Sequence, residues 1–367
     1  MNKTTPKRKK TSRLPGINAR AVTLKDIAAS LGVSAMTVSN ILQSNPNTKY
    51  RQETIERVQR EASRMGYQAN RSAQAIRRGK TGIIGFVGKS TNQCQKVHDI
   101  VSLPFMTGLS QFLIAHSKHV GLVELEELTT AESEVLPPVL RERFFDGLVV
   151  GHGLRKPFIK TVADSEVPAI FFDCGVFMPQ NCIYRDERYA TRKALDRLLE
   201  AGHRKIAFRW SKAYWDKIDQ DKHKHYSFAV REDAYQKYMI EHGLEPVSLK
   251  SDTIEGLVDE IRGTDCTAIL LDSHCPFILG ALYALNLRVP DDFSLVSIAC
   301  ETNIPVIDLE VSGMGFDRLA AGRQAAEMIC KLIDSPEAGQ PSIAIKSDWE
   351  DKGTLSKPVK RAKASLR

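Results

Sequence analysis

The chain has 367 residues, of which 42% are hydrophobic, so it is long enough for two or three domains of a soluble globular protein. It contains no apolar run of the roughly 18 to 20 residues that a membrane-spanning helix needs, and its basic start lacks the apolar stretch of a signal peptide. We therefore expect a cytoplasmic protein with no membrane partner, whose seven cysteines are reduced thiols.

The net charge of +8 is unevenly distributed along the chain. Residues 1–20 carry +7, residues 21–80 carry +6 and residues 352–367 carry +6, which leaves residues 81–351 with −11. Such an asymmetry indicates a terminal module that binds nucleic acid, attached to a body with a different task. We predict a basic disordered arm over 1–20 and a basic disordered tail over 351–367, although such tails are often only solvated.

The first predicted helix begins directly after the basic arm. Thr23 and Asp26 have the spacing of an N-terminal capping box, with Asp in place of the usual Glu or Gln. An apolar stripe follows at helical spacing: Leu24, Ile27, Ala28 and Leu31. Gly32 is placed to end this helix in the left-handed conformation.

Two further short helices are predicted after this turn. Ser34 can cap the second helix, which is expected to pack on the first through Val38, Ile41 and Leu42. The side chains expected to face outward are Ala35, Met36, Thr37, Ser39 and Asn40. A third helical pattern comprises Ile55, Val58, Ala62 and Met65. Three short helices with a tight turn between the first two describe a helix-turn-helix, whose second helix fits the major groove of DNA. The alternative is a small helical bundle that merely packs on another surface.

The body of the chain alternates short apolar runs with amphipathic stretches of helix length. The runs are 82–88, 120–125, 147–151, 168–173, 205–210, 268–272 and 293–299. Buried parallel strands are continuous apolar runs, and their alternation with helices is typical of right-handed βαβ units. The pattern predicts an open α/β architecture. Two such lobes with a cleft between them would resemble the periplasmic binding proteins, in which ligands lie off the carboxyl ends of the strands.

Several stretches together resemble the lactose-repressor (LacI/GalR) family of bacterial transcription regulators. They include "VTLKDIAASLGVSAMTVSNIL" (22–42), "TIERVQREASRMGYQANRSAQAIRRGKTGIIGFV" (54–87) and "GFDRLAAGRQAAEMICKLI" (315–333). The resemblance implies an N-terminal all-α helix-turn-helix domain with a hinge helix, followed by a two-lobed α/β periplasmic-binding-protein-like core. We assign residues 21–68 to the helix-turn-helix domain, 69–80 to the hinge helix and 81–350 to the effector-binding and dimerisation domain.

The resemblance also implies which residues contact DNA. Ala35 and Met36 match base-reading positions and can offer only apolar contact, whereas Asn40 can form a bidentate pair with adenine. Ile76 matches the hinge side chain that enters the minor groove. The positions expected to bond phosphates are Ser34, Thr37, Ser39, Arg51 and Arg71. Thr23, Asn70 and Ala73 complete the expected DNA-contacting set. The implied partners are a near-palindromic double-stranded operator and a second copy of the chain, which forms a homodimer.

The effector site is implied in the same way. Asp173 and Arg231 match two positions that contact the effector in the family. The family usually has Asn-Asp and Asp-Asp at two further positions of the site. In this chain the first pair is replaced by His274 and the residue after it, and the second by Ala299 and the residue after it. Because the lost acids would grip sugar hydroxyls, the retained arginine predicts an anionic effector, such as a sugar acid, a phosphosugar or an organic acid. The alternative is a core that has lost effector binding.

Metal and enzymatic functions have weaker support in the sequence. The run 215–227 contains the possible metal ligands Asp216, Asp219, Asp221, His223 and His225, but such a run is more often a solvated loop. The stretch 82–90 lacks the glycine spacing of a phosphate-binding loop, and no other catalytic motif is present. We therefore expect no cofactor and no enzymatic activity. A repressor of transcription is the main hypothesis, and a small-molecule-binding protein without a DNA role is the alternative.

Overall fold

The computed structural model describes residues 21–42, 49–69, 75, 79–88, 102–124, 137–151, 154, 156–209, 225–272, 276–300 and 310–359. The chain divides into two compact units, Met1–Gly79 and Lys80–Arg367. None of the helices in the described ranges is long and apolar enough to cross a membrane.

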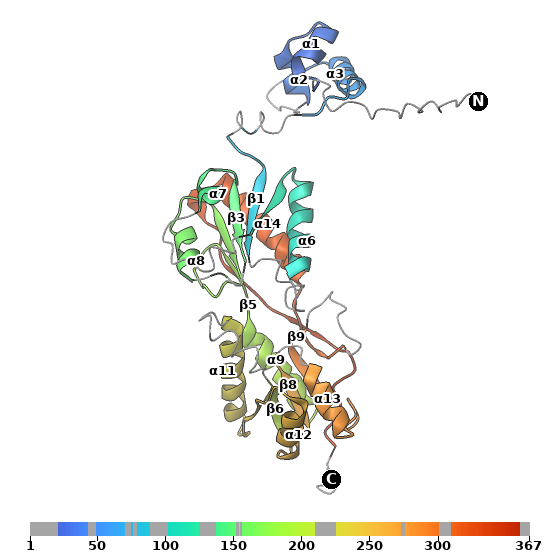
Figure 1. Cartoon of the computed structure of the whole chain (residues 1–367), viewed down its shortest axis with the longest axis vertical. Coiled ribbons are helices and arrows are strands. Elements are labelled where there is room, and N and C mark those ends of the chain that lie inside the picture. Colours follow the sequence, from blue (N-terminus) through green and yellow to red (C-terminus); the bar gives the residue numbers. More distant parts are fainter. Residues whose placement is uncertain are drawn as a thin grey trace, which may run out of the picture. The chain divides into compact units, whose positions relative to one another are not determined.

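The first unit is built from the three predicted helices (Figure 1). They are α1 (Leu24–Leu31), α2 (Ala35–Leu42) and α3 (Gln52–Arg64). The predicted capping box is present, because Thr23 Oγ1 accepts from the Asp26 N–H while the Thr23 N–H donates to Asp26 Oδ2. Gly32 ends α1 with a φ of 68°, as predicted. The buried core of the unit consists of Ile27, Ala28, Val38, Ile41, Val58 and Ala62.

Ser39 differs from its predicted position on the surface of α2. Its exposed fraction is only 3%, whereas that of Met36 is 61%. Ser39 lies about 100° around the helix axis from the core residue Val38. Since α2 packs against both α1 and α3, that flank of the helix is covered as well. The prediction that the Ser39 side chain faces outward is therefore wrong, and its contact with a phosphate stays a prediction.

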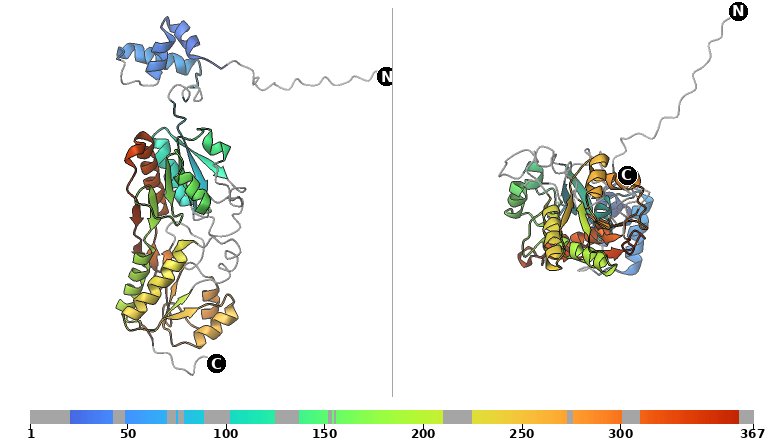
Figure 2. Two further views of the ribbon diagram at one scale, coloured as in Figure 1. Left: turned by 90° about the vertical axis from the view of Figure 1, so that its left-hand side faces the viewer. Right: turned by 90° about the horizontal axis from the view of Figure 1, so that it is seen from below.

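The second unit contains two six-stranded sheets, each at the centre of one lobe (Figures 1 and 2). The N-terminal lobe has the strand order β11-β5-β4-β3-β1-β2, and the C-terminal lobe has the order β12-β10-β9-β8-β6-β7. The strands of the first sheet are β1 (Ile83–Gly88), β2 (His119–Glu124), β3 (Gly147–Val150), β4 (Ala169–Phe172), β5 (Cys182–Arg185) and β11 (Ile343–Ile345). Those of the second are β6 (Ile206–Arg209), β7 (Val247–Leu249), β8 (Ala268–Leu271), β9 (Ser294–Cys300), β10 (Gly313–Gly315) and β12 (Asp348–Glu350).

All seven predicted apolar runs are strands, namely β1, β2, β3, β4, β6, β8 and β9. They pair in parallel, as predicted, and β12 on β10 is the antiparallel exception among the described pairs. Sequence analysis missed β5, β7, β10, β11 and β12. Three of these, β7, β11 and β12, have only three residues each and are half-exposed. Strands this short show no periodicity in the sequence.

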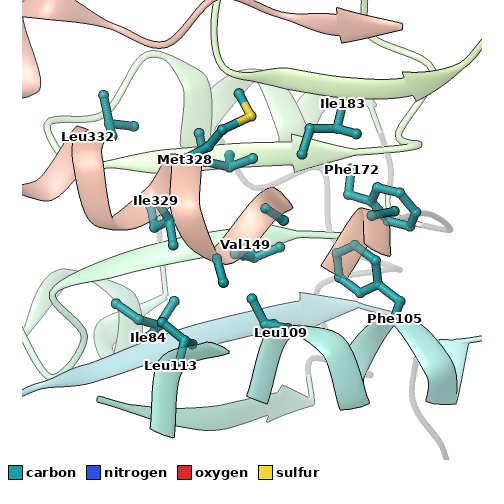
Figure 3. Close-up of a cluster of buried hydrophobic side chains, with 14 of the residues drawn as sticks. Ile84, Phe105, Leu109, Leu113, Val149, Phe172, Ile183, Met328, Ile329 and Leu332 are labelled. Atoms are coloured by element: carbon teal, nitrogen blue, oxygen red, sulfur yellow. The ribbon is translucent and has the colours of Figure 1, made fainter. Parts of the chain in front are cut away.

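Helices cover the two sheets. Those of the N-terminal lobe are α6 (Ser102–Ala115), α7 (Pro138–Arg141), α8 (Lys156–Ala163), α14 (Arg318–Asp334) and the 3-10 turn η3 (Pro336–Ala338). Those of the C-terminal lobe are α9 (Glu187–Glu200), α11 (Tyr226–Glu241), α12 (Ile254–Arg262) and α13 (Pro276–Ala284). The chain crosses between the lobes at β5–α9, β10–α14 and β11–β12. Figure 3 shows the main core of the N-terminal lobe, where α6 and α14 pack on β1, β3, β4 and β5.

The C-terminal segment belongs to the core up to at least Ser356. Thr354 is 2% exposed, and its hydroxyl donates to the Leu295 carbonyl oxygen at 2.7 Å. The Ser356 N–H donates to Ser294 Oγ, and its carbonyl oxygen lies 2.9 Å from His203 Nε2. The predicted tail therefore begins too early at residue 351. Charge suggested a solvated segment there, but its small hydroxyl side chains bond to the lobe. The predicted arm and the last eight residues lie outside the described residues.

His203 should make the stability of the C-terminal lobe depend on pH. Its ring is buried between Thr267, Ser294 and Ser356, and burial lowers the pKa of His203 below its ordinary 6.5. The unfolded chain therefore binds a proton more readily than the folded one, so stability is complete above about pH 6.5 and falls as the pH drops below it. Chemical denaturation at several pH values measures this slope.

The variant His203→Gln should flatten the pH dependence. His242→Gln is the matched control, because His242 is an exposed histidine of the same lobe. It should keep the slope of the unmodified protein. Equal slopes for His203→Gln and the unmodified protein would contradict this role of His203.

Candidate nucleic-acid interface and ligand site

The start of α2 presents a capped helix end with an apolar tip. The Thr37 N–H donates to Ser34 Oγ at 3.0 Å, and the two hydroxyl oxygens lie 2.9 Å apart. Ser34 therefore caps α2, as predicted. Met36 projects outward, while Ala35 and Thr37 are half-buried beside it. An exposed methionine on the first turn of a short helix can reach an apolar group such as a thymine methyl.

Asn40, one turn further along α2, is held by a residue that sequence analysis missed. Its Nδ2 donates to the Tyr50 hydroxyl at 3.1 Å. The contact uses one of the two amide N–H bonds, which leaves the other and the amide oxygen for the two-point contact that an adenine edge requires. Tyr50 stands before α3 and outside every helical pattern, so nothing in the sequence pointed to it.

Of the remaining predicted DNA-contacting residues, Thr23 and Arg51 lie among the described residues and four others do not. The Thr23 hydroxyl is engaged in the capping box of α1, where it donates to Asp26 Oδ2 at 2.7 Å. Arg51 occupies the cap position of α3, is exposed, and makes no side-chain capping bond. Four predicted positions lie outside the described residues: Asn70, Arg71, Ala73 and Ile76. Of the predicted hinge helix, only Ala75 and residues 79–80, together with Ala69 at its start, are described.

A chain of buried charges joins the two lobes of the second unit. Asp173 directly follows β4 of the N-terminal lobe. Its Oδ2 accepts from Arg185 Nε at 3.0 Å, and its Oδ1 accepts from the Tyr226 hydroxyl of the C-terminal lobe at 2.6 Å. His225 Nε2 lies 3.0 Å from the Asp173 carbonyl oxygen. One carboxylate of the first lobe thus holds the start of α11 in the second.

The same chain of charges continues into the C-terminal lobe. Arg185 Nη2 lies 3.1 Å from Glu187 Oε1, and Arg231 forms a bidentate pair with Glu187 at 2.6 and 2.9 Å. Arg231 Nη1 also donates to Asp272, to its Oδ1 at 2.9 Å and to its carbonyl oxygen at 2.8 Å. We call Asp173, Arg185, Glu187, Arg231 and Asp272 the interlobe network. It lies at the carboxyl ends of β4, β5 and β8, which is the edge where open α/β sheets bind ligands.

Three members of the interlobe network, Asp173, Glu187 and Arg231, are stabilised in their charged forms, whereas burial raises the pKa of Asp272 above its usual value. Burial opposes ionisation of Asp173, but Arg185, His225 and Tyr226 together hold the pKa of this carboxyl well below its usual range. Burial opposes ionisation of Glu187 too, but Arg185 and Arg231 keep the pKa of Glu187 lowered. Arg231 is also buried, and Glu187 and Asp272 nevertheless raise the pKa of its guanidinium above the ordinary value. Asp173 and Glu187 are therefore held as carboxylates beside guanidinium groups.

The structure brings Asp173 and Arg231 into this one network, but it leaves Arg231 little capacity for a ligand. Four hydrogen bonds from its guanidinium go to Glu187 and Asp272, and the side chain is buried. Ala299 lies at the carboxyl end of β9, half-buried, with its N–H donating to Ser297 Oγ. His274 lies outside the described residues.

Sequence analysis missed Arg185, Glu187, Tyr226 and Asp272 as members of the site. Asp272 ended a predicted strand and offered a signal, whereas Arg185 and Glu187 flank a connection that follows the unpredicted β5. His225, from the predicted metal run, caps α11 by accepting from the Ser227 N–H. The other candidate ligands of that run lie outside the described residues. Within the described part of the chain, no group of three or more His, Cys, Asp or Glu residues could hold a metal ion.

Two protein-family profiles match the chain. Residues 23–70 match the profile described as bacterial regulatory proteins, lacI family, and residues 195–354 match that of the periplasmic binding protein-like domain. Over 338 residues the chain is 28% identical to the HTH-type transcriptional regulator RafR of Escherichia coli, covering 87% of this chain and 95% of that protein.

Solved structures show the same architecture. The lac repressor dimer bound to operator and the anti-inducer ONPF aligns with a TM-score of 0.68 and 21% identity, over 92% of this chain and 100% of that one. The complex of the transcriptional regulator CelR with cellobiose aligns with a TM-score of 0.58 and 20% identity, over 91% and 99% of the two chains. These similarities confirm the predicted fold class, a helix-turn-helix domain followed by a two-lobed α/β core.

Proposed function

Because the chain belongs to the LacI family of bacterial regulatory proteins, we propose that it is a transcriptional repressor whose affinity for an operator is controlled by a small molecule bound in its core. The chain is a DNA-binding regulator and not an enzyme. The observation that carries the proposal is the capped, outward-facing start of α2, in a segment with a net charge of +6 over residues 21–80. Binding to chromosomal DNA would place the protein in the cytoplasm.

Operator binding can be tested directly. Purified full-length protein should select one near-palindromic site from genomic fragments, and its affinity should fall steeply as salt is raised, because cationic side chains release counterions from the phosphates. Binding that shows no sequence preference at any salt concentration would contradict a repressor function.

Asn40 is proposed to read one base of each half-site. Asn40→Ala should relax the preference at one symmetric pair of operator positions and weaken specific binding by about 1 to 3 kcal/mol, since the two-point contact with the base is lost. Arg51→Ala is the control, because an exposed cation that meets a phosphate should affect all sequences alike. Selection of binding sites from random DNA measures both effects. A base preference that Asn40→Ala leaves unchanged would rule out this role.

A homodimer is supported by apolar side chains on the surface of the core. Leu103 and Ile114 on α6, Leu122 on the edge strand β2, and Tyr283 on α13 are all exposed. Figure 1 shows α6 and α13 on the same side of the core. One helix-turn-helix makes few base contacts. Two chains paired through this side would together present two helix-turn-helix motifs to a near-palindromic operator. The similar lac repressor structure is itself a dimer.

Leu122→Asp should weaken this dimer. In a two-fold interface the substitution buries two carboxylates, so we expect the dimer dissociation constant to rise at least about tenfold, with a matching loss of operator affinity. Ile240→Asp is the matched control, because Ile240 is as exposed as Leu122 but lies on α11, on the other side of the core. Sedimentation at several concentrations distinguishes the two variants. A Leu122→Asp dimer as tight as the unmodified one would reject the proposed interface.

Effector binding at the edge of the interlobe network is also part of the proposal. Its support is the placement of the network at the carboxyl ends of the strands, the edge where such sheets bind ligands. A structural neighbour, CelR, was solved with cellobiose. A bound effector should raise the melting temperature and shift operator affinity, typically by about 1 to 3 kcal/mol. A panel of neutral sugars, sugar acids and phosphosugars, followed by operator binding in the presence of each hit, tests this.

One observation favours a second candidate, a repressor whose core no longer binds an effector. Arg231, on which the prediction of an anionic ligand rested, already has two carboxylate partners. An incoming anion would have to displace them. Loss of effector binding would leave both the melting temperature and the operator affinity unchanged across the whole panel.

A further inference from the structure

Arg209, the last residue of β6, is buried with most of its donors unused. Its side chain is 0% exposed. Nη2 donates to the Ser251 carbonyl oxygen at 2.7 Å and to Asp252 Oδ1 at 3.2 Å. Nε and Nη1 have no hydrogen-bond partner. Among the described residues, no other buried side-chain nitrogen or oxygen atom lacks a hydrogen-bond partner.

Such an arrangement is costly for a folded protein. Each buried donor without an acceptor lowers stability by about 1 to 3 kcal/mol, and buried cations normally carry a full set of partners. Arg231 of the same lobe is an example, with four hydrogen bonds to two acidic residues. An incompletely bonded buried group needs an explanation, and one is a bound molecule that supplies the acceptors which the described residues do not.

The position of Arg209 suits a ligand. It ends a parallel strand between β7 and β8, at the ligand-binding edge of the sheet. Its carbonyl oxygen accepts from the N–H of Asp272, a member of the interlobe network. Side chains alternate along a strand, so Arg209 shares a face with Ala207, which packs in the core formed with α12 and α13.

The guanidinium also lies beside the N-terminus of α12. Ser251 and Asp252, its two partners, directly precede Thr253, the capping residue of this nine-residue helix. The Thr253 hydroxyl satisfies the Gly256 N–H. The first N–H groups of a helix have no partner within the helix and favour negative charge. Asp252 neutralises the guanidinium in part, but only through Nη2, so the need for acceptors at Nε and Nη1 stays.

We propose that Arg209 and the first turn of α12 bind an oxyanion, the carboxylate or phosphate group of the effector. This inference rests on the proposed effector function, and it moves the anion-binding role to Arg209 from Arg231, whose three guanidinium nitrogens each have an acceptor. Charged acceptors form the shortest and strongest hydrogen bonds with guanidinium, and they offset its burial as a neutral hydroxyl does not. The backbone bond between Arg209 and Asp272 would connect a bound anion to the interlobe network.

The test uses full-length protein dialysed free of phosphate. Inorganic phosphate, gluconate and glucose 6-phosphate are the probes, with glucose and sodium chloride at matched ionic strength as references. At least one anionic probe should raise the melting temperature and bind measurably by calorimetry. Arg209→Met should weaken that binding at least tenfold. Arg262→Met is the matched control, because it removes an exposed arginine at the other end of α12 and should bind as the unmodified protein does.

Stability in the absence of any probe separates a binding role from a structural one. Dialysed Arg209→Met should melt close to the unmodified protein, because removing the two unsatisfied donor atoms offsets the loss of the Nη2 bonds to Ser251 and to the partly exposed Asp252. If this variant does not fold, Arg209→Lys, which keeps the charge and loses the planar donors, takes its place in the binding comparison. A large loss of melting temperature in a folded Arg209→Met would overturn the inference, as would binding of glucose alone. If the unmodified protein binds operator but none of the anions, only this inference is overturned. If it binds no operator, the proposed function is overturned.

Discussion

Gly322→Ala is expected to destabilise the N-terminal lobe by about 3 kcal/mol or more. A Cβ atom at Gly322 of α14 would lie 2.0 Å from the Phe105 carbonyl oxygen and 2.8 Å from the Leu109 nitrogen, both in the backbone of α6. Gly108 of α6 is the reciprocal position, because its Cβ would lie 2.0 Å from the Leu319 carbonyl oxygen. The two helices therefore touch through their backbones, and neither can give way as a flexible side chain would.

Denaturation followed by circular dichroism measures this loss. Gly263→Ala is the control, since its nearest neighbour would be 3.4 Å away and its backbone conformation suits any residue. We expect a change within about 0.5 kcal/mol for that variant. The core in Figure 3, built from α6 and α14 side chains, depends on this close approach. A Gly322→Ala protein as stable as the Gly263→Ala control would show that the helices can separate at little cost.

Glu187→Ala should destabilise the core by about 3 to 5 kcal/mol, the range found when one partner of a buried ion pair is removed. Glu187 is 3% exposed and pairs with both Arg185 and Arg231. Its loss leaves the buried guanidinium of Arg231 and the largely covered one of Arg185 short of an acceptor, at the point where the chain passes from β5 into the second lobe.

The matched control for this variant is Glu241→Ala. Glu241 pairs with Arg192 on the surface at 2.8 Å, and solvent screens that pair, so its loss should change stability by less than about 1 kcal/mol. Glu187→Gln keeps the shape of the side chain and separates lost charge from lost packing. Equal stability of Glu187→Ala and Glu241→Ala would mean that the interlobe network contributes no more than a surface ion pair.

The carboxylates of the network also predict how the stability of the core changes as the pH falls. The pKa values of Asp173 and Glu187 are held below their usual range, so their contribution is present above the ordinary carboxyl pKa and is lost as the pH falls through the lowered values. This loss occurs at a lower pH than the one expected for His203, so the two effects are separable in one series of denaturation curves.

Local patterns in the sequence determined the three helices of the first unit and seven strands of the second. The Thr23 and Asp26 spacing predicted the start of α1, and Gly32 predicted its end, because a capping box and a left-handed glycine act over three or four residues. The apolar run at 268–272 predicted β8 for a similar reason, since a strand buried on both faces needs no information from elsewhere in the chain.

Only the tertiary structure decided what surrounds each side chain. Ser39 is buried because α2 packs against both α1 and α3, and Thr354 is buried because its segment returns to the second lobe. Glu187 meets Arg231 across 44 residues, and Arg209 meets Ser251 across 42. Such pairs depend on which strands become neighbours and on where the chain crosses between lobes, and no periodicity encodes that. The sequence therefore determined the three helices of the first unit and the main strands of the second, and it indicated the family. Only the folded chain shows that every guanidinium nitrogen of Arg231 has an acceptor and that two of Arg209 have none, because hydrogen bonds form between whichever groups the packed sheets and helices bring within about 3 Å.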